Sequence, residues 1–206
     1  MIKLFHEKRI DDALNLVLRN VQSRINSLSD YEILNRDLNQ MAGEISQNHQ
    51  INELEIDLND RKVETTMENI PGSLFPPGTD VRENQYYSCA KVNYTFTIQS
   101  GDPELLSVHP RTGSLNYDVR AEVNGHQFTI GYQTRYSNSH LSDQVKQDVK
   151  DEIRPIIQSA RQVIDAINNE VKDFNKNLKG QIQSSLEDKR QELQKRNDQN
   201  DDLNKL

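Results

Sequence analysis

The sequence has no tryptophan, a single cysteine at position 89, and only 6% aromatic residues over a length of 206. One cysteine excludes an intrachain disulfide framework and a cysteine-based metal site. Hydrophobic residues make up 33% of the chain, and the mean hydropathy is -0.87. This composition is lean for a compact globule and is typical of long helices that each bury one apolar stripe.

Long apolar segments are absent as well. No run approaches the roughly 20 residues of a membrane span, and residues 1–9 lack the apolar core of a signal peptide. We therefore expect a cytoplasmic protein with no membrane partner. The net charge of -7 makes nucleic acid a poor candidate partner, because binding to phosphates draws on Lys and Arg.

The sequence also lacks the motifs that carry chemistry. It contains no GxGxxG, no Walker-type loop and no GxSxG. Its histidines are scattered without ligand spacing, at His6, His49, His109, His126 and His140. We therefore predict no catalytic residue, no metal, no cofactor and no enzymatic activity.

Residues 141–197 show the clearest pattern that is present, a helical stripe of apolar residues at steps of three and four. Pro155 lies inside this pattern and predicts a kink or a restart of the helix. The stripe from Leu141 to Leu186 covers 45 residues in 12 steps, so it drifts by about 15° per step around a helix of 3.6 residues per turn. That drift favours contact with different partners along the helix over a two-stranded coiled coil.

Two further helices are expected before residue 50. Apolar residues from Ile10 to Leu28 follow a helical period, and Ser29 with Glu32 forms a capping box for a second helix that runs to Ile45. Two amphipathic helices joined by a tight turn predict a helical hairpin in which each covers the other's stripe.

From residue 51 the period changes to the alternation of strands. Residues 54–58 predict one strand, Asn59-Asp60 a turn, and residues 63–67 the returning strand, whereas residues 86–98 form the longest alternating run. Asn124-Gly125 between two alternating runs predicts a hairpin. The fold class is therefore α+β, with a helical hairpin (1–50), an antiparallel sheet of four to five strands (51–137), and a long C-terminal helix kinked near Pro155 (138–206).

Two surfaces are candidates for binding. The end of the long helix predicts a self-association interface made by Val171, Phe174, Leu178, Ile182, Leu186 and Leu193. Tyrosine, phenylalanine and arginine beside a proline-rich loop predict a recognition surface, since these residues are favoured at interfaces. Its members are Phe75, Arg82, Tyr86, Tyr87 and Arg135.

The order of helical hairpin, sheet and long helix, with Phe174-Asn175-x-x-Leu178 followed by Ile182, Leu186 and Arg190, resembles N-terminal modules of bacterial multidomain antiphage defence proteins. In those proteins a similar segment precedes a TIR or nuclease effector domain. The resemblance implies a sensing or assembly role, with a protein partner, a second copy of the chain (a homo-oligomer) or a downstream effector. No catalytic residue follows from it.

Two alternatives stay open. Terminal helices that flank β structure resemble prefoldin and would imply a holdase-like chaperone, although the β part of prefoldin is much shorter than residues 54–136. The other alternative is a small-ligand sensor with a pocket beside the sheet, in which Arg82, His109 or Arg111 binds an anionic group.

Overall fold

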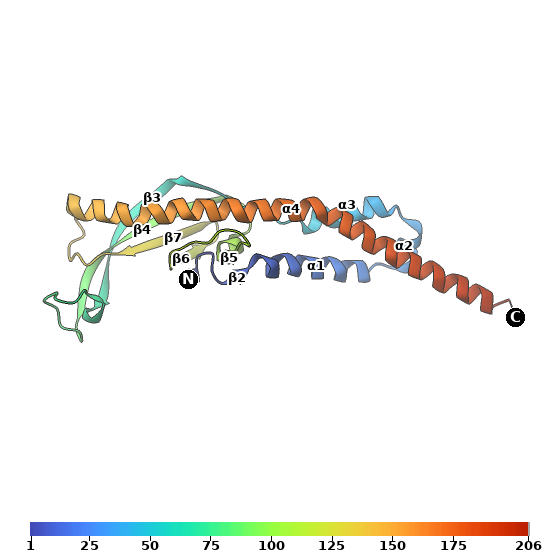
Figure 1. Cartoon of the computed structure of the whole chain (residues 1–206), viewed down its shortest axis with the longest axis horizontal. Coiled ribbons are helices and arrows are strands. Elements are labelled where there is room, and N and C mark those ends of the chain that lie inside the picture. Colours follow the sequence, from blue (N-terminus) through green and yellow to red (C-terminus); the bar gives the residue numbers. More distant parts are fainter. Residues whose placement is uncertain (206) are drawn as a thin grey trace. The chain divides into compact units, whose positions relative to one another are not determined.

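The computed structural model describes residues 1–205 and has the α+β architecture expected from the sequence (Figure 1). The chain divides into two compact units, each built from separate segments. The first unit comprises Met1–Lys8 and Leu54–Ile167, and the second comprises Arg9–Glu53 and the residues from Asn168 onward. The boundaries expected at 50/51 and 137/138 separate types of secondary structure, whereas these units group the segments that pack together.

The first unit contains a five-stranded antiparallel sheet with the strand order β1-β6-β7-β4-β3. Its strands are β1 (Ile2–Lys3), β3 (Glu55–Pro71), β4 (Tyr86–Ser100), β6 (Arg120–Asn124) and β7 (Gln127–Gln133). Two short strands, β2 (Lys8–Arg9) and β5 (Val108–His109), pair separately, and the short 3-10 helices are Gly72–Leu74 and Pro103–Ser107. The predicted four to five strands are thus confirmed, while β1 is too short to show an alternation in the sequence.

The predicted hairpin between β6 and β7 is present, with its turn one residue later than expected. Asn124 pairs with Gln127, so Gly125 and His126 form the two-residue loop. Gly125 has a φ of 58°, a conformation that glycine adopts without steric cost. The glycine therefore takes the first position of the loop, as in the hairpin turns that require positive φ there.

The turn predicted at Asn59-Asp60 is wrong. Ile56 pairs with Ile98 and Arg61 pairs with Phe96, so both halves of β3 pair with β4, and the residues between them bulge out of the ladder. Leu58 in this bulge is buried, and the Asn59 N–H donates to Asp57 Oδ1 at 2.8 Å. Burial of Leu58 and this local hydrogen bond hold a bulge where the sequence suggests a reversal.

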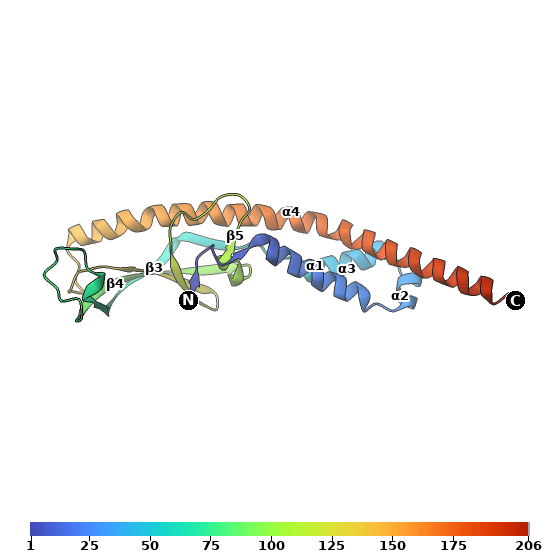
Figure 2. The ribbon, with the colours of Figure 1, turned by 60° about the horizontal axis from the view of Figure 1, so that its bottom comes forward.

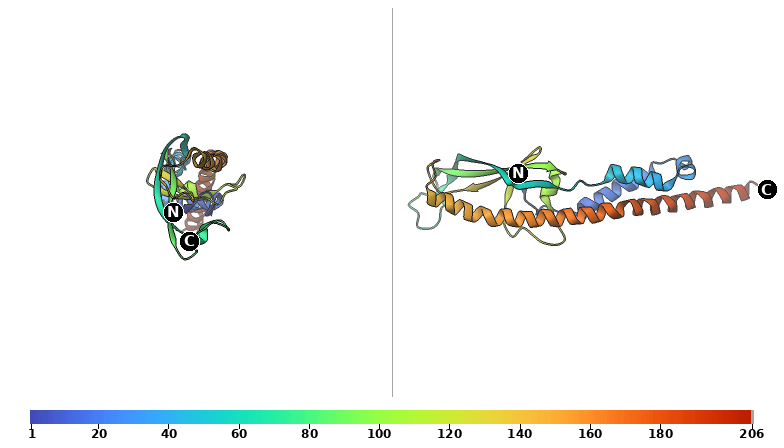
Figure 3. Two further views of the ribbon diagram at one scale, coloured as in Figure 1. Left: turned by 90° about the vertical axis from the view of Figure 1, so that its left-hand side faces the viewer. Right: turned by 90° about the horizontal axis from the view of Figure 1, so that it is seen from above.

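One face of the sheet carries the core of the first unit. Its central side chains are buried, namely Ala90, Val92, Tyr94, Phe96, Ile98, Phe128 and Ile130. The beginning of α4 (Asp143–Leu203) lies along this face, where it buries Val149, Ile153, Ala160 and Val163 (Figure 3). The opposite face is left to polar residues, as the alternation along β4 requires.

Pro155 lies inside α4, and the helix runs through it without a break. The separate short helix expected before Pro155 is therefore part of α4. An interior proline costs about 3 kcal/mol, because it removes an N–H donor and crowds the carbonyl one turn back. Burial of Ile153 and Ala160 on either side offsets that cost and keeps the flanking turns helical.

The second unit contains α1 (Ile10–Asn26), α2 (Asp30–Asn35), α3 (Leu38–His49) and the later part of α4 (Figure 2). The Ser29–Glu32 capping box at the start of α2 is confirmed. The single second helix expected up to Ile45 is in fact two helices, because Arg36 is extended and the Asp37 side chain accepts from the Gln40 N–H at 2.7 Å. Asp37 thereby caps a new helix.

Candidate interaction site at the sheet edge

Strand β3 is the last strand of the sheet, with β4 on one side only. The direction of its free hydrogen-bonding groups follows from β4. The Ala90 N–H donates to Tyr136 O at 2.7 Å, and Ala90 O accepts from the Thr134 N–H at 3.0 Å. Thr134 and Tyr136 follow β7, so the even-numbered residues of β4 direct their backbone N–H and C=O groups toward β7 and away from β3. Because this direction alternates along a strand, the odd-numbered residues of β4 direct theirs toward β3.

The register between β3 and β4 then shows which way the backbone N–H and C=O groups of β3 point. Lys91 pairs with Thr66 and Asn93 pairs with Glu64, so even-numbered β3 residues bond to β4. The odd-numbered residues direct their N–H and C=O groups outward, and these residues are Val63, Thr65, Met67 and Asn69. An open edge of this length is a template for pairing with another strand.

The side chains along this edge differ between the two faces. On the polar face, Lys62 lies 3.6 Å from Glu64, and Lys91 lies 2.9 Å from Glu68. On the face that α4 covers, Val63 and Met67 remain 50% and 42% exposed. The edge therefore combines ordered charges on one face with apolar side chains that lack a cover on the other.

Two grooves lie between this edge and α4 within the first unit. One, of about 410 Å³, is lined by apolar side chains that include Val63, Val92, Leu141 and Val149. The other, of about 600 Å³, carries four cationic side chains and no carboxylate, with Arg61, Lys150, Arg154 and Arg161 around Tyr94. Burial raises the pKa of the Tyr94 hydroxyl, and the charge of Arg61 opposes that rise.

The predicted recognition surface lies at the far end of the β3–β4 hairpin. Phe75 makes an edge-on contact with Tyr87 at 5.4 Å, and the Arg135 guanidinium lies 5.8 Å from the Phe75 ring. The Tyr87 hydroxyl accepts from the Arg82 N–H at 2.8 Å. Tyr86 takes no part in these contacts and is 72% exposed. The structure thus brings four of the five residues together, and their role in recognition stays a prediction.

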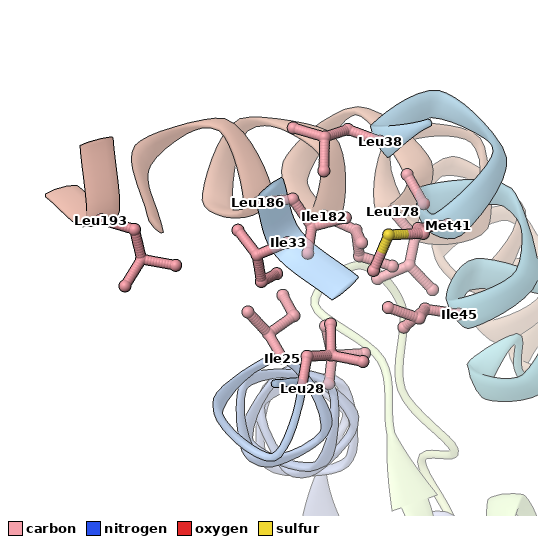
Figure 4. Packing of buried hydrophobic residues seen from close by; sticks show 12 residues of the cluster. Ile25, Leu28, Ile33, Leu38, Met41, Ile45, Leu178, Ile182, Leu186 and Leu193 are labelled. Atoms are coloured by element: carbon pink, nitrogen blue, oxygen red, sulfur yellow. The ribbon is translucent and has the colours of Figure 1, made fainter. Parts of the chain in front are cut away.

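The self-association interface expected on α4 is occupied within the chain. Figure 4 shows Leu178, Ile182 and Leu186 directed toward side chains of α1, α2 and α3. Leu193 belongs to the same buried cluster. These four residues and Val171 are buried, and Phe174 is partly buried against the same cluster. The stripe is therefore core of the second unit, because the N-terminal helices cover it, and its buried side chains are not exposed on the surface of the folded chain.

The residues named for an anionic pocket are not those of the cationic groove. Arg82 belongs to the hairpin tip, and His109 lies in β5, where its ring stacks on His6 at 6.2 Å. Within residues 1–205 no group of three or more His, Cys, Asp or Glu side chains is arranged to hold a metal ion. None of the helices described is long and apolar enough to cross a membrane.

Comparison with protein-family models, with curated proteins and with solved structures finds no match to this chain. The open β3 edge was not among the sequence candidates. Its alternation is visible in the sequence, whereas its position at the end of the sheet depends on the strand order.

Proposed function

We propose that this chain is a non-enzymatic interaction and assembly module that binds a protein strand at the open edge of β3. The observation that carries the proposal is the outward direction of the N–H and C=O groups of Val63, Thr65 and Met67, which follows from the register and the β4 hydrogen bonds. Added strands gain affinity from such main-chain groups and specificity from alternate side chains. A role in bacterial defence stays a prediction of the resemblance.

A matched pair of proline variants tests the edge. Thr65→Pro removes an N–H that points outward, a position where edge strands tolerate proline. Thr66→Pro removes an N–H that bonds to β4, so it should unfold the edge. A labelled peptide that copies residues 61–69 serves as the strand probe in fluorescence anisotropy. We expect the peptide to bind the natural chain but not Thr65→Pro, although the two proteins melt at the same temperature. Equal binding to both would refute the edge as the site.

A second candidate function is supported by the cationic groove. Four cations and no carboxylate line it in a chain of net charge -7, which favours an anionic small ligand such as a nucleotide. Within the described residues Lys150 makes no ion pair and no side-chain hydrogen bond, whereas Arg154 lies 3.6 Å from Asp151. Arg61 donates to Leu58 O, and Arg161 donates to Asn59 Oδ1. Lys150 is thus the cation most available to a ligand.

A thermal-shift titration with ATP and with inorganic phosphate tests the groove. We expect stabilisation that falls with added salt, since the ligand contacts are between exposed charges. Lys150→Glu should abolish it, and Lys195→Glu, an exposed change in the second unit, should leave it intact. A flat response from the natural chain would remove this candidate.

A further inference from the structure

We propose that the strand bound at β3 is β3 of a second copy, paired antiparallel about a two-fold axis at Thr65. This inference rests on the proposed function, since it names the partner of the same edge. The axis places residues 61–69 of one copy against residues 69–61 of the other, so the two sheets join into one. The partner is identified by the self-complementary charges and side chains of this segment.

Symmetry first limits the registers. Two antiparallel copies can hydrogen-bond only if facing residues both direct their N–H and C=O groups outward, as Val63, Thr65 and Met67 do. The two-fold axis must therefore pass through a residue and not between two residues. Facing residues then share the same face of the sheet, so polar side chains meet polar ones and apolar side chains meet apolar ones.

Charge then selects among these registers. With the axis at Thr65, Lys62 of each copy faces Glu68 of the other, which gives two symmetric pairs of opposite charge. These even-numbered residues form the non-hydrogen-bonded pairs of the new ladder, in which side chains approach most closely. Glu68 already lies 2.9 Å from Lys91 in its own chain, so its carboxylate is held at the face where the second Lys62 arrives.

The neighbouring registers are less favourable, two because of charge and one because of its length. An axis at Glu64 sets the two Glu64 side chains directly against each other. An axis at Thr66 sets Glu64 against Glu68 twice, and like charges in facing positions oppose pairing. An axis at Val63 pairs Lys62 with Glu64 but runs into the bulge before Arg61, which shortens the ladder to five residues.

The other face of the ladder supports the same register. With the axis at Thr65, Val63 of each copy faces Met67 of the other, and the two Thr65 side chains meet at the centre. Val63 and Met67 are the exposed apolar side chains of this face, and the pairing covers both. Cross-strand pairs that include β-branched residues are among those that stabilise sheets.

Charge reversal tests the register directly. Lys62→Glu and Glu68→Lys each place like charges opposite one another in the two-fold dimer. Each should raise the dissociation constant of the dimer by about tenfold. In a 1:1 mixture of the two variants, position 62 of either chain again faces an opposite charge at position 68 of the other. Sedimentation velocity should therefore show dimer in the mixture at a concentration where each variant alone is monomeric.

The mixture also contains its own control. Within each chain, the substitution alters the contact with Glu64 or with Lys91 equally whether the variant is alone or mixed. Only the contact between copies therefore differs. A dimer of the natural chain whose association survives both single variants, or whose mixture stays monomeric, would overturn the Thr65 register.

The result separates this inference from the proposed function. A natural chain that stays monomeric at its highest soluble concentration overturns the second copy as partner. If the 61–69 peptide still binds and Thr65→Pro abolishes that binding, the edge remains a strand-binding site with another partner. If the peptide does not bind either, the proposed function fails as well.

Discussion

Asn175 in α4 holds the backbone of Ile51 through two hydrogen bonds. The Ile51 N–H donates to Asn175 Oδ1 at 3.1 Å, and Asn175 Nδ2 donates to Ile51 O at 2.8 Å. The side-chain amide thus pairs with a peptide group as a neighbouring strand would. Because both residues belong to the second unit, this contact anchors the chain that follows α3 onto α4.

Asn175→Asp should destabilise the protein by about 1–3 kcal/mol, because a carboxylate still accepts from the Ile51 N–H but offers no donor to Ile51 O. Urea unfolding followed by circular dichroism measures the loss. Asn177→Ala is the control, since among the described residues the Asn177 amide bonds only to Asp173 O of its own helix, at 2.9 Å on the surface. Equal losses from the two changes would contradict the anchoring role.

Leu178→Ala should cost about 2–5 kcal/mol, since a fully buried leucine leaves a cavity between α4 and α3. The folded fraction should associate as the natural chain does, because this side chain is core and not interface. Leu203→Ala, at a leucine that is 68% exposed on the same helix, should change stability little. A loss of association without a loss of stability would restore the α4 stripe as an interface.

Gly72→Ala should loosen the tip of the β3–β4 hairpin. A Cβ at this position would lie 2.1 Å from the backbone oxygen of Arg82, so the loop must move and the hydrogen bond from the Gly72 N–H to Gln85 O (2.7 Å) is lost. We expect faster amide exchange from residue 72 to residue 87, with the rest of the sheet unchanged.

Gly180→Ala serves as the comparison for Gly72→Ala and should stabilise the protein. A Cβ there meets no atom within 4 Å, and alanine in a helix interior is favoured over glycine by about 1 kcal/mol. Thermal unfolding should show a higher midpoint for this variant. A lower midpoint would mean that α4 does not run through Gly180 as a regular helix.

Cys89 should make the stability fall at alkaline pH. Burial raises the pKa of its thiol, and the charge of Arg135 opposes that rise. The pKa of this thiol is higher in the folded than in the unfolded chain. Its contribution to the free energy of unfolding is therefore complete below the ordinary thiol pKa of about 8.5 and is lost as the pH rises through the folded pKa. The free energy of unfolding of Cys89→Ala should therefore depend less steeply on pH in this range than that of the natural chain.

Alkylation provides an independent measurement of the same group. The thiolate is the reactive form, so iodoacetamide should modify Cys89 in the folded chain more slowly than in urea at the same pH. Removing the opposing charge with Arg135→Gln should slow the reaction further. Rapid modification of the folded chain at neutral pH would contradict both the burial and the direction of the pKa shift.

Local chemistry in the sequence determines which segments become helices and strands. The capping box of Ser29 and Glu32, the helical stripe after Leu141 and the hairpin signal at Asn124-Gly125 all act over a few residues. The structure contains each of them, with the turn of the hairpin one residue later than predicted. The errors are local as well. Arg36-Asp37 divides a helix, and Asn59-Asp60 forms a bulge in place of a turn, because tertiary burial of Leu58 outweighs the preference of the turn residues.

Tertiary structure alone decides which surfaces remain free. The stripe of Leu178 and Leu186 and the alternation of Val63 and Met67 look equally like exposed or buried apolar sets in the sequence. Packing against α1, α2 and α3 buries the first set, whereas the strand order places the second at an open edge. A periodic pattern shows that a side chain needs a cover, and only contacts between segments distant in the sequence show whether the chain itself provides it.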